Sequence, residues 1–261
     1  MDSAMIHIEN IHKTFLMGRE AVLALRGIDL DVQPGEMVCL MGPSGSGKTT
    51  LLNIVGGLEE PSRGHVWVKG QNVVAMSEDK LARLRLSTMG FVFQNYNLLA
   101  NFTAHENVEA PMSLAGMRGR KRRQKADELL ELVGLSDRGH HYPTELSGGQ
   151  QQRVAIARAL ANNPDILIGD EITGDLDSVT GYEVMDLVAR LNRERGTTVI
   201  FVTHDPRMAT YARRLIQIRD GQIISDEPGE GRTAAPAAEG ETVSPTAEGE
   251  TVSPAAEGET L

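Results

Sequence analysis

Apolar and polar residues alternate along the first part of the chain, and this alternation predicts β-strands. It is clear enough over residues 5–15 and 21–32 to suggest two β segments joined by a loop, as in a hairpin. The continuous apolar run at 37–41 is typical of a strand buried on both faces. The N-terminal region is therefore expected to be mainly β-structure. Further short strands are predicted at 66–68, 73–74 and 90–94.

The apolar spacing changes to that of helices further along the chain. Residues 121–133 place their apolar side chains on one face, and Gly134 follows where the helix should end. Residues 148–161 repeat this pattern before Pro164, which stops a helix. We therefore expect a helical insertion over about residues 95–160.

The strand pattern returns after the insertion. Apolar runs at 166–168 and 198–202 are separated by a helical pattern over about 180–195. Asp220-Gly221 lies between two short apolar runs, as a hairpin turn would. The chain is therefore expected to have an α/β core that the helical insertion interrupts.

The most informative motif lies between the apolar run 37–41 and a helical pattern at 48–55. Residues 42–49 read Gly-Pro-Ser-Gly-Ser-Gly-Lys-Thr, and the order strand, glycine loop, helix is the setting of a phosphate-binding loop. Lys48 can reach the β- and γ-phosphates, and the Thr49 hydroxyl can ligate Mg²⁺. A chance glycine-rich turn is the alternative, and the flanking strand and helix disfavour it. The expected nucleotide contacts of the loop are Gly42, Pro43, Ser44, Gly45, Ser46, Gly47, Lys48, Thr49 and Thr50.

Two acidic residues, Asp170 and Glu171, end the apolar run that begins at Ile166. A carboxylate at the end of a parallel strand beside a phosphate loop is placed to hold Mg²⁺, and we assign this role to Asp170, through a water. Glu171 can point toward the γ-phosphate and polarise an attacking water. A solvated strand end is the alternative interpretation of either acid alone.

A second candidate anion site is the sequence Leu-Ser-Gly-Gly-Gln at residues 146–150. It offers a hydroxyl, two flexible N–H groups and the N-terminus of the helix that follows. A lone Ser-Gly-Gly could simply cap a helix. The full pentapeptide in a chain with a phosphate loop is stronger evidence.

These motifs, with Gln94 and His204, stand in the order and spacing of ABC-type ATPases, and the chain resembles that family over about residues 4–225. The resemblance implies a P-loop NTPase of the α/β class, with a RecA-like core, an antiparallel β subdomain and an inserted α-helical subdomain. It also implies ATP and Mg²⁺ as ligands and a head-to-tail homodimer in the ATP-bound state. Each ATP would lie between the phosphate loop of one subunit and residues 146–150 of the other.

The resemblance also implies individual roles. Phe15 would stack on the adenine, an ordinary core phenylalanine being the alternative. Gln94 would link Mg²⁺ and water to the helical subdomain, and His204 would sense the γ-phosphate. Ser147 and Gly149 would contact the γ-phosphate across the dimer. The expected catalytic residues are Glu171, His204, Gln94 and Lys48. The expected metal ligands are Thr49, Gln94 and Asp170. The other expected nucleotide-binding residues are Phe15, Ser147, Gly148, Gly149, Gln150 and Asp177, of which Asp177 would lie at the dimer contact.

One position departs from the family pattern, because Ile172 stands where the family usually has the proline of Asp-Glu-Pro-Thr. Proline fixes φ and isoleucine does not, so the placement of Glu171 is less constrained. Within the family the chain is most similar to the macrolide-exporter and lipoprotein-release ATPases, on residues 93–99, 106–108 and 146–153. The resemblance to this group implies a cytoplasmic protein, peripheral on the inner face of the cell membrane.

The expected function is that of an ATP-hydrolysing subunit that powers or gates a separate integral-membrane permease. A soluble ABC-type ATPase acting on ribosomes or DNA is an alternative, and Ile172 keeps open a slow nucleotide-gated scaffold. Ribosome-acting members typically carry two cassettes in one chain, whereas this chain has one. DNA-repair members insert a long coiled coil between the positions of Lys48 and Ser147, and this chain has no room for one there. The cargo is not encoded here.

Composition argues against a membrane-spanning helix, a signal peptide and an intrachain disulfide. The longest apolar runs are far shorter than the ~20 residues that cross a bilayer, and the start of the chain has no signal-peptide pattern. Cys39 is the only cysteine, which excludes an intrachain disulfide.

The net charge of −10 is concentrated at the C-terminus. Residues 226–261 carry nine acidic residues and one arginine, which leaves a net charge of −2 for residues 1–225. We therefore expect no nucleic-acid partner. The sequence Ala-Glu-Gly-Glu-Thr recurs from residues 238, 247 and 256 with few large apolar residues, so an ATPase domain at 1–225 and a disordered acidic tail at 226–261 are expected.

Two segments allow more than one interpretation. The basic cluster at 119–123 is interpreted as a solvated helix start that acidic residues follow, and contact with lipid headgroups or RNA is the alternative. The segment 95–107 is more apolar than a solvated loop needs. Its apolar side chains either pack the insertion or form the groove that the family resemblance implies for a short permease helix. They are Tyr96, Leu98, Leu99 and Phe102.

Overall fold

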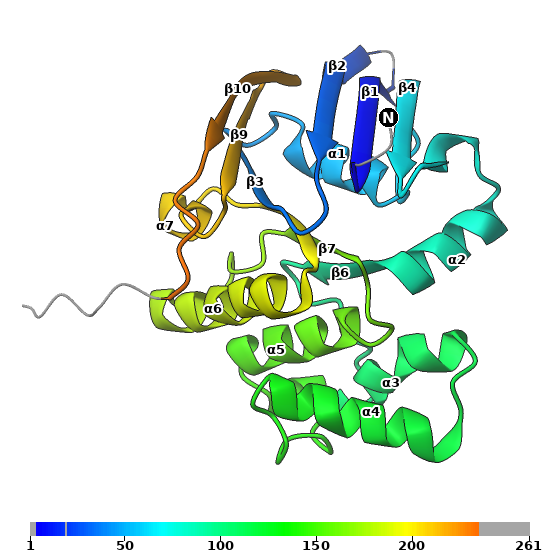
Figure 1. The fold of residues 1–261 in the computed structure, drawn as a ribbon, viewed down its shortest axis with the longest axis vertical. Helices are drawn as coiled ribbons and strands as arrows, with labels where there is room; N and C mark the ends of the chain where they lie inside the picture. The colour runs from blue at the N-terminus through cyan, green and yellow to red at the C-terminus, as the bar shows by residue number, and fades with distance from the viewer. Residues whose placement is uncertain (1–3, 19, 235–261) are drawn as a thin grey trace, which may run out of the picture.

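The computed structural model describes residues 4–18 and 20–234, which form two β-sheets with helices packed against them (Figure 1). The α/β architecture expected from the hydrophobic pattern is confirmed. The repeats of the acidic tail lie outside the described residues. None of the helices in these two ranges is long and apolar enough to cross a membrane.

An antiparallel sheet contains the N-terminal hairpin. Its strands are β1 (Ile6–Met17), β2 (Glu20–Val32), β4 (Arg63–Val68) and β5 (Gln71–Asn72). Their order is β2-β1-β4-β5, and β1 pairs with both β2 and β4. Ile6 and Ile8, and Ile11 after a bulge, are buried, so one side of β1 faces the core.

The prediction of a strand at residues 73–74 is wrong. These residues form a 3-10 turn, η1 (Val73–Ala75), because the Asn72 side chain accepts a hydrogen bond from the Val74 N–H at 3.1 Å. Asn72 thereby caps the turn, and the extended backbone ends there.

A second, mostly parallel sheet positions the phosphate loop. Its strands are β3 (Met37–Met41), β6 (Met89–Phe93), β7 (Ile166–Asp170), β8 (Thr198–Val202), β9 (Arg214–Arg219) and β10 (Gln222–Pro228). Their order is β10-β9-β3-β8-β7-β6, and only the β9–β10 pair is antiparallel. The carboxyl ends of β3, β6, β7 and β8 therefore meet at one edge. β10 continues past residue 225, and the division of the chain there stays a prediction.

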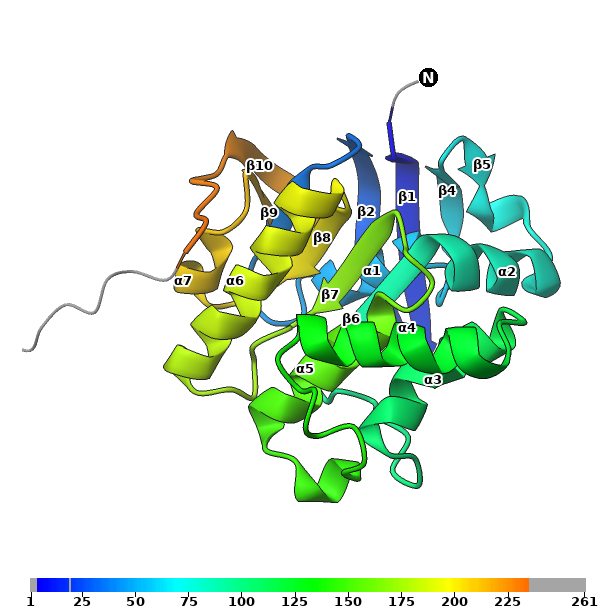
Figure 2. The ribbon, with the colours of Figure 1, turned by 60° about the horizontal axis from the view of Figure 1, so that its bottom comes forward.

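Helices cover this sheet (Figure 2). They are α1 (Lys48–Val55), α2 (Glu78–Thr88), α6 (Ser178–Arg195) and α7 (Pro206–Ala209). The pattern predicted α1 and α6 but neither α2 nor α7. The apolar stripe of α2 is thin, because Leu81 and Leu84 are its only buried apolar residues.

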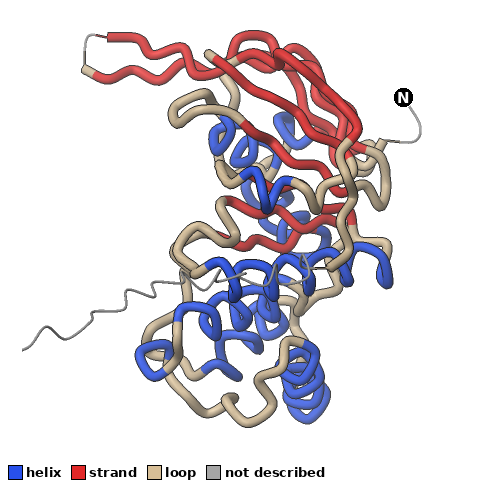
Figure 3. Tube along the Cα trace, turned by 90° about the vertical axis from the view of Figure 1, so that its left-hand side faces the viewer, coloured by secondary structure: helices blue, strands red, loops and turns tan. Residues whose placement is uncertain are grey.

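The helical insertion lies between β6 and β7 and forms one end of the molecule (Figure 3). It contains α3 (Ala104–Leu114), α4 (Gly119–Leu132), the 3-10 turn η2 (Pro143–Glu145) and α5 (Gly148–Ala159). Met112, Leu129 and Val154 come from three of these helices and are buried in one cluster. The sheet therefore carries the phosphate loop, while a separate helical unit carries residues 146–150.

Candidate functional site

A cavity of about 630 Å³ lies at the carboxyl edge of the parallel strands. The phosphate loop forms one wall, and the ends of β6, β7 and β8 supply the residues opposite. It is lined by Ala24, Ser44, Gly45, Ser46, Gly47, Lys48, Thr49, Thr50, Gln94, Asp170, Glu171 and His204. All but Ala24 were predicted from the sequence, so the fold brings them together.

The phosphate loop wraps around the Lys48 ammonium. Lys48 is buried, and its Nζ donates to the carbonyl oxygens of Gly42 and Pro43 at 2.9 and 2.8 Å. Gly47 has φ 102°, and a Cβ there would lie 2.5 Å from the Ala24 carbonyl oxygen, so only glycine fits. Burial lowers the pKa of Lys48, which the negative charges of Glu171 and Asp170 oppose.

Ser46 marks the loop as an anion cradle. Its hydroxyl oxygen is buried and has no hydrogen-bond partner among the described residues. A buried polar atom without a partner is costly unless a ligand satisfies it. The unpaired hydroxyl, the buried ammonium and the start of α1 fit a polyphosphate.

Asp170 and Thr49 meet across the cavity. The Thr49 hydroxyl donates to Asp170 Oδ1 at 3.0 Å. Burial raises the pKa of Asp170, while the Thr49 hydrogen bond acts against this rise. A hydroxyl and a carboxylate at this separation are oxygen donors that suit Mg²⁺.

Glu171 adopts an unusual backbone conformation, with φ 53°. Its N–H donates to the Val202 carbonyl at 3.1 Å, and its Oε2 lies 2.7 Å from His204 Nδ1. Left-handed φ values are uncommon and costly for non-glycine residues, so the surrounding contacts must hold this conformation. The hydrogen bonds to β8 and to His204 hold Glu171 at the cavity wall.

Ile172 is held by packing and by a hydrogen bond instead of a proline ring. Its side chain is buried, and a Cβ on Gly169 would lie 2.4 Å from its Cδ1. The Gln152 Nε2 donates to the Ile172 carbonyl at 2.5 Å. Gln152 thus links α5 to the Glu171 turn, a role that the sequence did not indicate because the partner is distant in the chain.

Gln94 is oriented toward the segment after Glu171. Its Nε2 donates to Asp175 Oδ1 at 3.0 Å. Two residues later, Tyr96 and Asn97 both have positive φ, and Arg158 of α5 donates to their carbonyl oxygens at 2.7 and 2.5 Å. Arg158, which the sequence did not indicate, therefore fixes this turn to the helical insertion.

Residues 146–150 begin α5 and do not line the cavity. Ser147 caps the helix, accepting from the Gln150 N–H at 3.3 Å, while the Gln150 side chain accepts from the Ser147 N–H at 3.0 Å. A Cβ on Gly149 would lie 2.3 Å from Thr180 Cγ2, so this glycine lets α5 approach the start of α6. Gly148 approaches the Tyr96 hydroxyl.

Asp177 caps α6 beside Gly149. It accepts from the Thr180 N–H at 3.0 Å and from the Thr180 hydroxyl at 2.6 Å. The hydroxyl hydrogen bond lowers the pKa of Asp177. Asp177, Ser147 and the glycines thus form a surface of their own outside the cavity.

Phe15 lies on the β1–β2 hairpin, outside both buried hydrophobic clusters. It is half-buried, and the Lys13 Nζ lies 4.8 Å from its ring centroid. Ala24, which lines the cavity, is on the neighbouring strand, and Phe15 pairs with Val22 of that strand.

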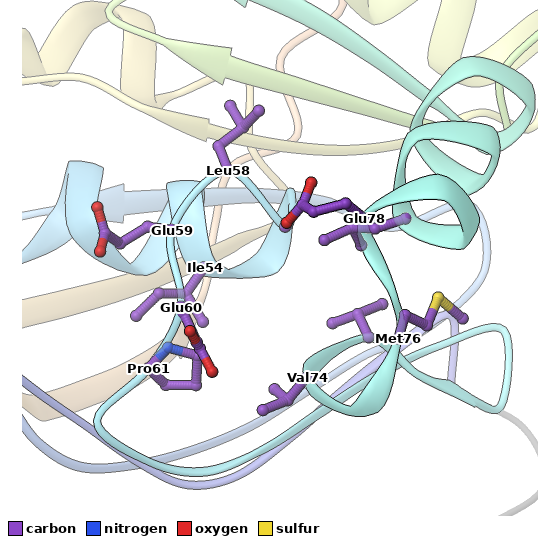
Figure 4. Close-up of a pocket in the computed structure, with 11 residues that line it drawn as sticks. Ile54, Leu58, Glu59, Glu60, Pro61, Val74, Met76 and Glu78 are labelled. Atoms are coloured by element: carbon purple, nitrogen blue, oxygen red, sulfur yellow. The ribbon is translucent and has the colours of Figure 1, made fainter.

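A smaller hollow of about 190 Å³ lies between the loop after α1 and the start of α2 (Figure 4). Glu59, Glu60 and Glu78 are among the residues that line it. Lys13 forms an ion pair with Glu59 and donates to the Glu60 carbonyl at 2.6 Å. The contacts of Lys13 hold β1 against the loop that follows α1.

A groove of about 470 Å³ lies between the helical insertion and the edge strand β6. Its walls come from α2, β6, α3 and α5 and are mainly apolar. Among the residues that line it are Leu58, Leu86, Met89, Phe91, Leu99 and Leu114.

The apolar residues predicted in the segment 95–107 divide between the groove and other roles. Leu99 lines the groove and is 47% exposed. Leu98 packs against the buried core, and the Tyr96 ring lies near Gly148. Phe102 is exposed but does not line the groove.

The fold and the cavity define the class of protein. A glycine loop between a parallel strand and a helix, a buried lysine, and a threonine that meets an aspartate at the end of another parallel strand are the features of a P-loop nucleotide hydrolase.

Comparison with known proteins narrows this class. Residues 25–174 match the ABC transporter family. The chain is 52% identical over 227 residues to the macrolide export ATP-binding/permease protein MacB of Syntrophobacter fumaroxidans, covering 86% of this chain and 32% of that protein. It is 46% identical over 231 residues to the ABC transporter ATP-binding protein MJ0796 of Methanocaldococcus jannaschii, covering 87% of this chain and 98% of that protein.

A solved structure extends the match to three dimensions. It is a dimeric structure of the MJ0796 cassette in a post-hydrolysis state bound to ADP and Pi, with a TM-score of 0.81 and 45% identity, covering 86% of this chain and 98% of that one. The chain belongs to the ABC transporter family, as an ATPase cassette. It spans about a third of the length of the MacB relatives, and the expected resemblance to that group is confirmed.

Proposed function

We propose that this chain binds and hydrolyses ATP as a dimer and thereby powers or gates a separate membrane permease of the macrolide-exporter type. The observation that carries the proposal is the meeting of Lys48, Thr49, Asp170 and Glu171 in one cavity. The dimeric MJ0796 structure and the MacB relatives support it. The chain would then work as a cytoplasmic protein, peripheral on the inner face of the membrane.

The residues of the cavity divide the chemistry between them. Lys48 and the N–H groups of the loop hold the β- and γ-phosphates, exchanging the carbonyl contacts of Lys48 for phosphate oxygens. Glu171 accepts the proton of the attacking water, and His204, hydrogen-bonded to Glu171, contacts the γ-phosphate. Gln94 would contact the same water and thereby link the nucleotide site to the helical insertion.

Thr49 and Asp170 would hold Mg²⁺, with Gln94 as a further ligand. A Mg²⁺ ion held there would offset the negative charge of the phosphates. The hydroxyl of Thr49 and the carboxylate of Asp170 already face each other at 3.0 Å. Burial raises the pKa of Asp170, and a bound cation would act against this rise by favouring the charged carboxylate.

The dimer would complete the site. Ser147 is exposed, and none of residues 146–150 lines the cavity of its own chain. The capped N-terminus of α5 is nevertheless a suitable anion contact. A head-to-tail dimer would place this surface, with Asp177, over the ATP of the partner.

Phe15→Ala tests the nucleotide base contact. We expect ATP affinity to fall by roughly 1–3 kcal/mol, because a base stacked on an aromatic ring loses that contact. Turnover at saturating ATP should change less. Isothermal titration with ATP measures the effect, and Phe102→Ala, at an exposed ring away from the cavity, is the control. Unchanged affinity would show that Phe15 does not contact the base.

Leu99→Glu tests the permease contact. An apolar groove receives an amphipathic helix through buried side chains, and a carboxylate on its wall opposes that contact. We expect the variant to keep its ATPase activity in isolation and to lose co-purification with the permease from solubilised membranes.

The control for this test is Ile224→Glu, which places a carboxylate at an exposed isoleucine of β10, outside the groove. It should co-purify as the unchanged chain does. Normal permease binding by Leu99→Glu would move the docking surface elsewhere, and loss of folding would show that Leu99 supports the core.

A further inference from the structure

The start of α4 carries an unusual concentration of positive charge. Residues 115–126 contain six basic residues and no acidic residue, although residues 1–225 have a net charge of only −2. Arg122 forms an ion pair with Glu109 at 3.2 Å. The other five have no hydrogen bond or ion pair through their side chains in the described part of the chain; they are Arg118, Arg120, Lys121, Arg123 and Lys125.

The acidic residues that follow do not neutralise this cluster. Asp127 lies 3.1 Å from the His105 ring, and Glu128 accepts from the Gln124 side chain at 3.2 Å. The cluster lies at the largely exposed start of α4, as the sequence predicted, and Asp127 and Glu128 form no ion pair with it in the described part of the chain. The positive charge remains available at the surface.

The position of the cluster works against the stability of α4. Cations are unfavourable at a helix N-terminus, where the helix dipole is positive, and the first turn of α4 has no acidic residue. Lys121 and Lys125 are four residues apart, so they repel each other on one face. Departures from local rules of this kind are expected at functional or strained sites.

The end of α3, just before α4, adds an exposed apolar side chain. Leu114, the last residue of α3, is 79% exposed and also lines the groove proposed to receive the permease. Figures 1 and 3 place the helical insertion at the end of the molecule opposite the antiparallel sheet. The basic cluster begins at Arg118, four residues after Leu114, in the same helical insertion.

We propose that Leu114 and the basic start of α4 contact the anionic surface of the membrane in which the permease lies. A cationic cluster attracts anionic headgroups, and a neighbouring exposed leucine enters the interface between headgroups and acyl chains. The orientation toward the membrane rests on the proposed docking of a permease in the groove. A nucleic-acid track is disfavoured, because the cluster covers only about two helix turns on a body of net negative charge.

Vesicle flotation of the full chain tests the proposal without a permease. The chain should float with vesicles of phosphatidylcholine and phosphatidylglycerol, stay behind with phosphatidylcholine alone, and be released by high salt. Arg120→Glu/Arg123→Glu should reduce binding about 10-fold or more, since the electrostatic attraction is lost. Both changes place acid near a helix N-terminus, so the variant should fold at least as well.

Matched controls separate this proposal from the proposed function. Lys80→Glu/Arg193→Glu makes the same charge change at exposed positions of α2 and α6 and should keep vesicle binding. ATPase activity in solution should be unchanged in both double variants, so an inactive chain would count against the ATPase proposal only. Leu99→Glu should still bind vesicles.

Several outcomes would overturn the proposal. Equal loss of binding in the control would show a general charge effect, and unchanged binding in the α4 variant would show that α4 is not the contact. Displacement from vesicles by RNA, lost in the α4 variant, would assign the cluster to nucleic acid. Vesicle binding only after removal of residues 235–261 would show that the basic cluster binds the acidic tail instead of the membrane.

Discussion

Replacing Glu171 by glutamine is expected to lower ATP turnover by about 100-fold or more, because the amide cannot accept the proton of the attacking water. The phosphate cradle should be unaffected, since Lys48, Ser46 and the loop lie on other elements. ATP affinity should therefore stay near that of the unchanged chain. Steady-state phosphate release and ATP titration measure the two quantities separately.

Glu194→Gln provides the matched control for this prediction. Glu194 is an exposed carboxylate on α6 and does not line the cavity. The same chemical change there should leave turnover unaltered. Near-normal turnover by Glu171→Gln would show that Glu171 is not the base. This result would be expected if Ile172, in place of the usual proline, leaves the Glu171 carboxylate out of position.

The second large effect is expected for Lys48→Ala. A hydrogen bond to a charged group contributes about 1.5–3 kcal/mol, so losing the ammonium should weaken ATP binding about 10- to 150-fold. Hydrolysis should fall further, because the ammonium also stabilises the charge of the transferring phosphoryl group. The carbonyls of Gly42 and Pro43 would also lose their partner, so circular dichroism should verify the fold.

Lys80→Ala is the control for the lysine substitution. Lys80 is exposed in the first turn of α2, away from the cavity. Its removal should change neither ATP affinity nor turnover. An affinity for ATP that survives Lys48→Ala intact would contradict the assignment of the cavity to the phosphates.

The parts of the site that local sequence encodes could be predicted. The loop at 42–49 follows a buried strand and begins a helix, so its geometry is fixed by neighbours in the chain. Asp170 ends a strand of the same parallel sheet, and this topology brings it to Thr49. Such inferences need only the order of elements and the type of residue at a strand end.

The parts that depend on contacts between distant segments could not be predicted. Gln152 and Arg158 project from α5 to carbonyl groups at residue 172 and at residues 96–97, and no periodicity identifies a carbonyl as the partner of a side chain. The strand expected at 73–74 was wrong because a single side chain, Asn72, capped a turn there. Side-chain hydrogen bonds of this kind override β-propensity.

In the dimer that we propose, ATP lies between the phosphate loop of one chain and residues 146–150 of another. The most direct measurement is the mass of Glu171→Gln in solution, by size-exclusion chromatography with light scattering, with and without ATP and Mg²⁺. We expect a dimer with ATP and Mg²⁺, a monomer without them, and a monomer again when Ser147→Arg is added. A monomer at saturating ATP, or a dimer that Ser147→Arg does not disturb, would contradict this proposal.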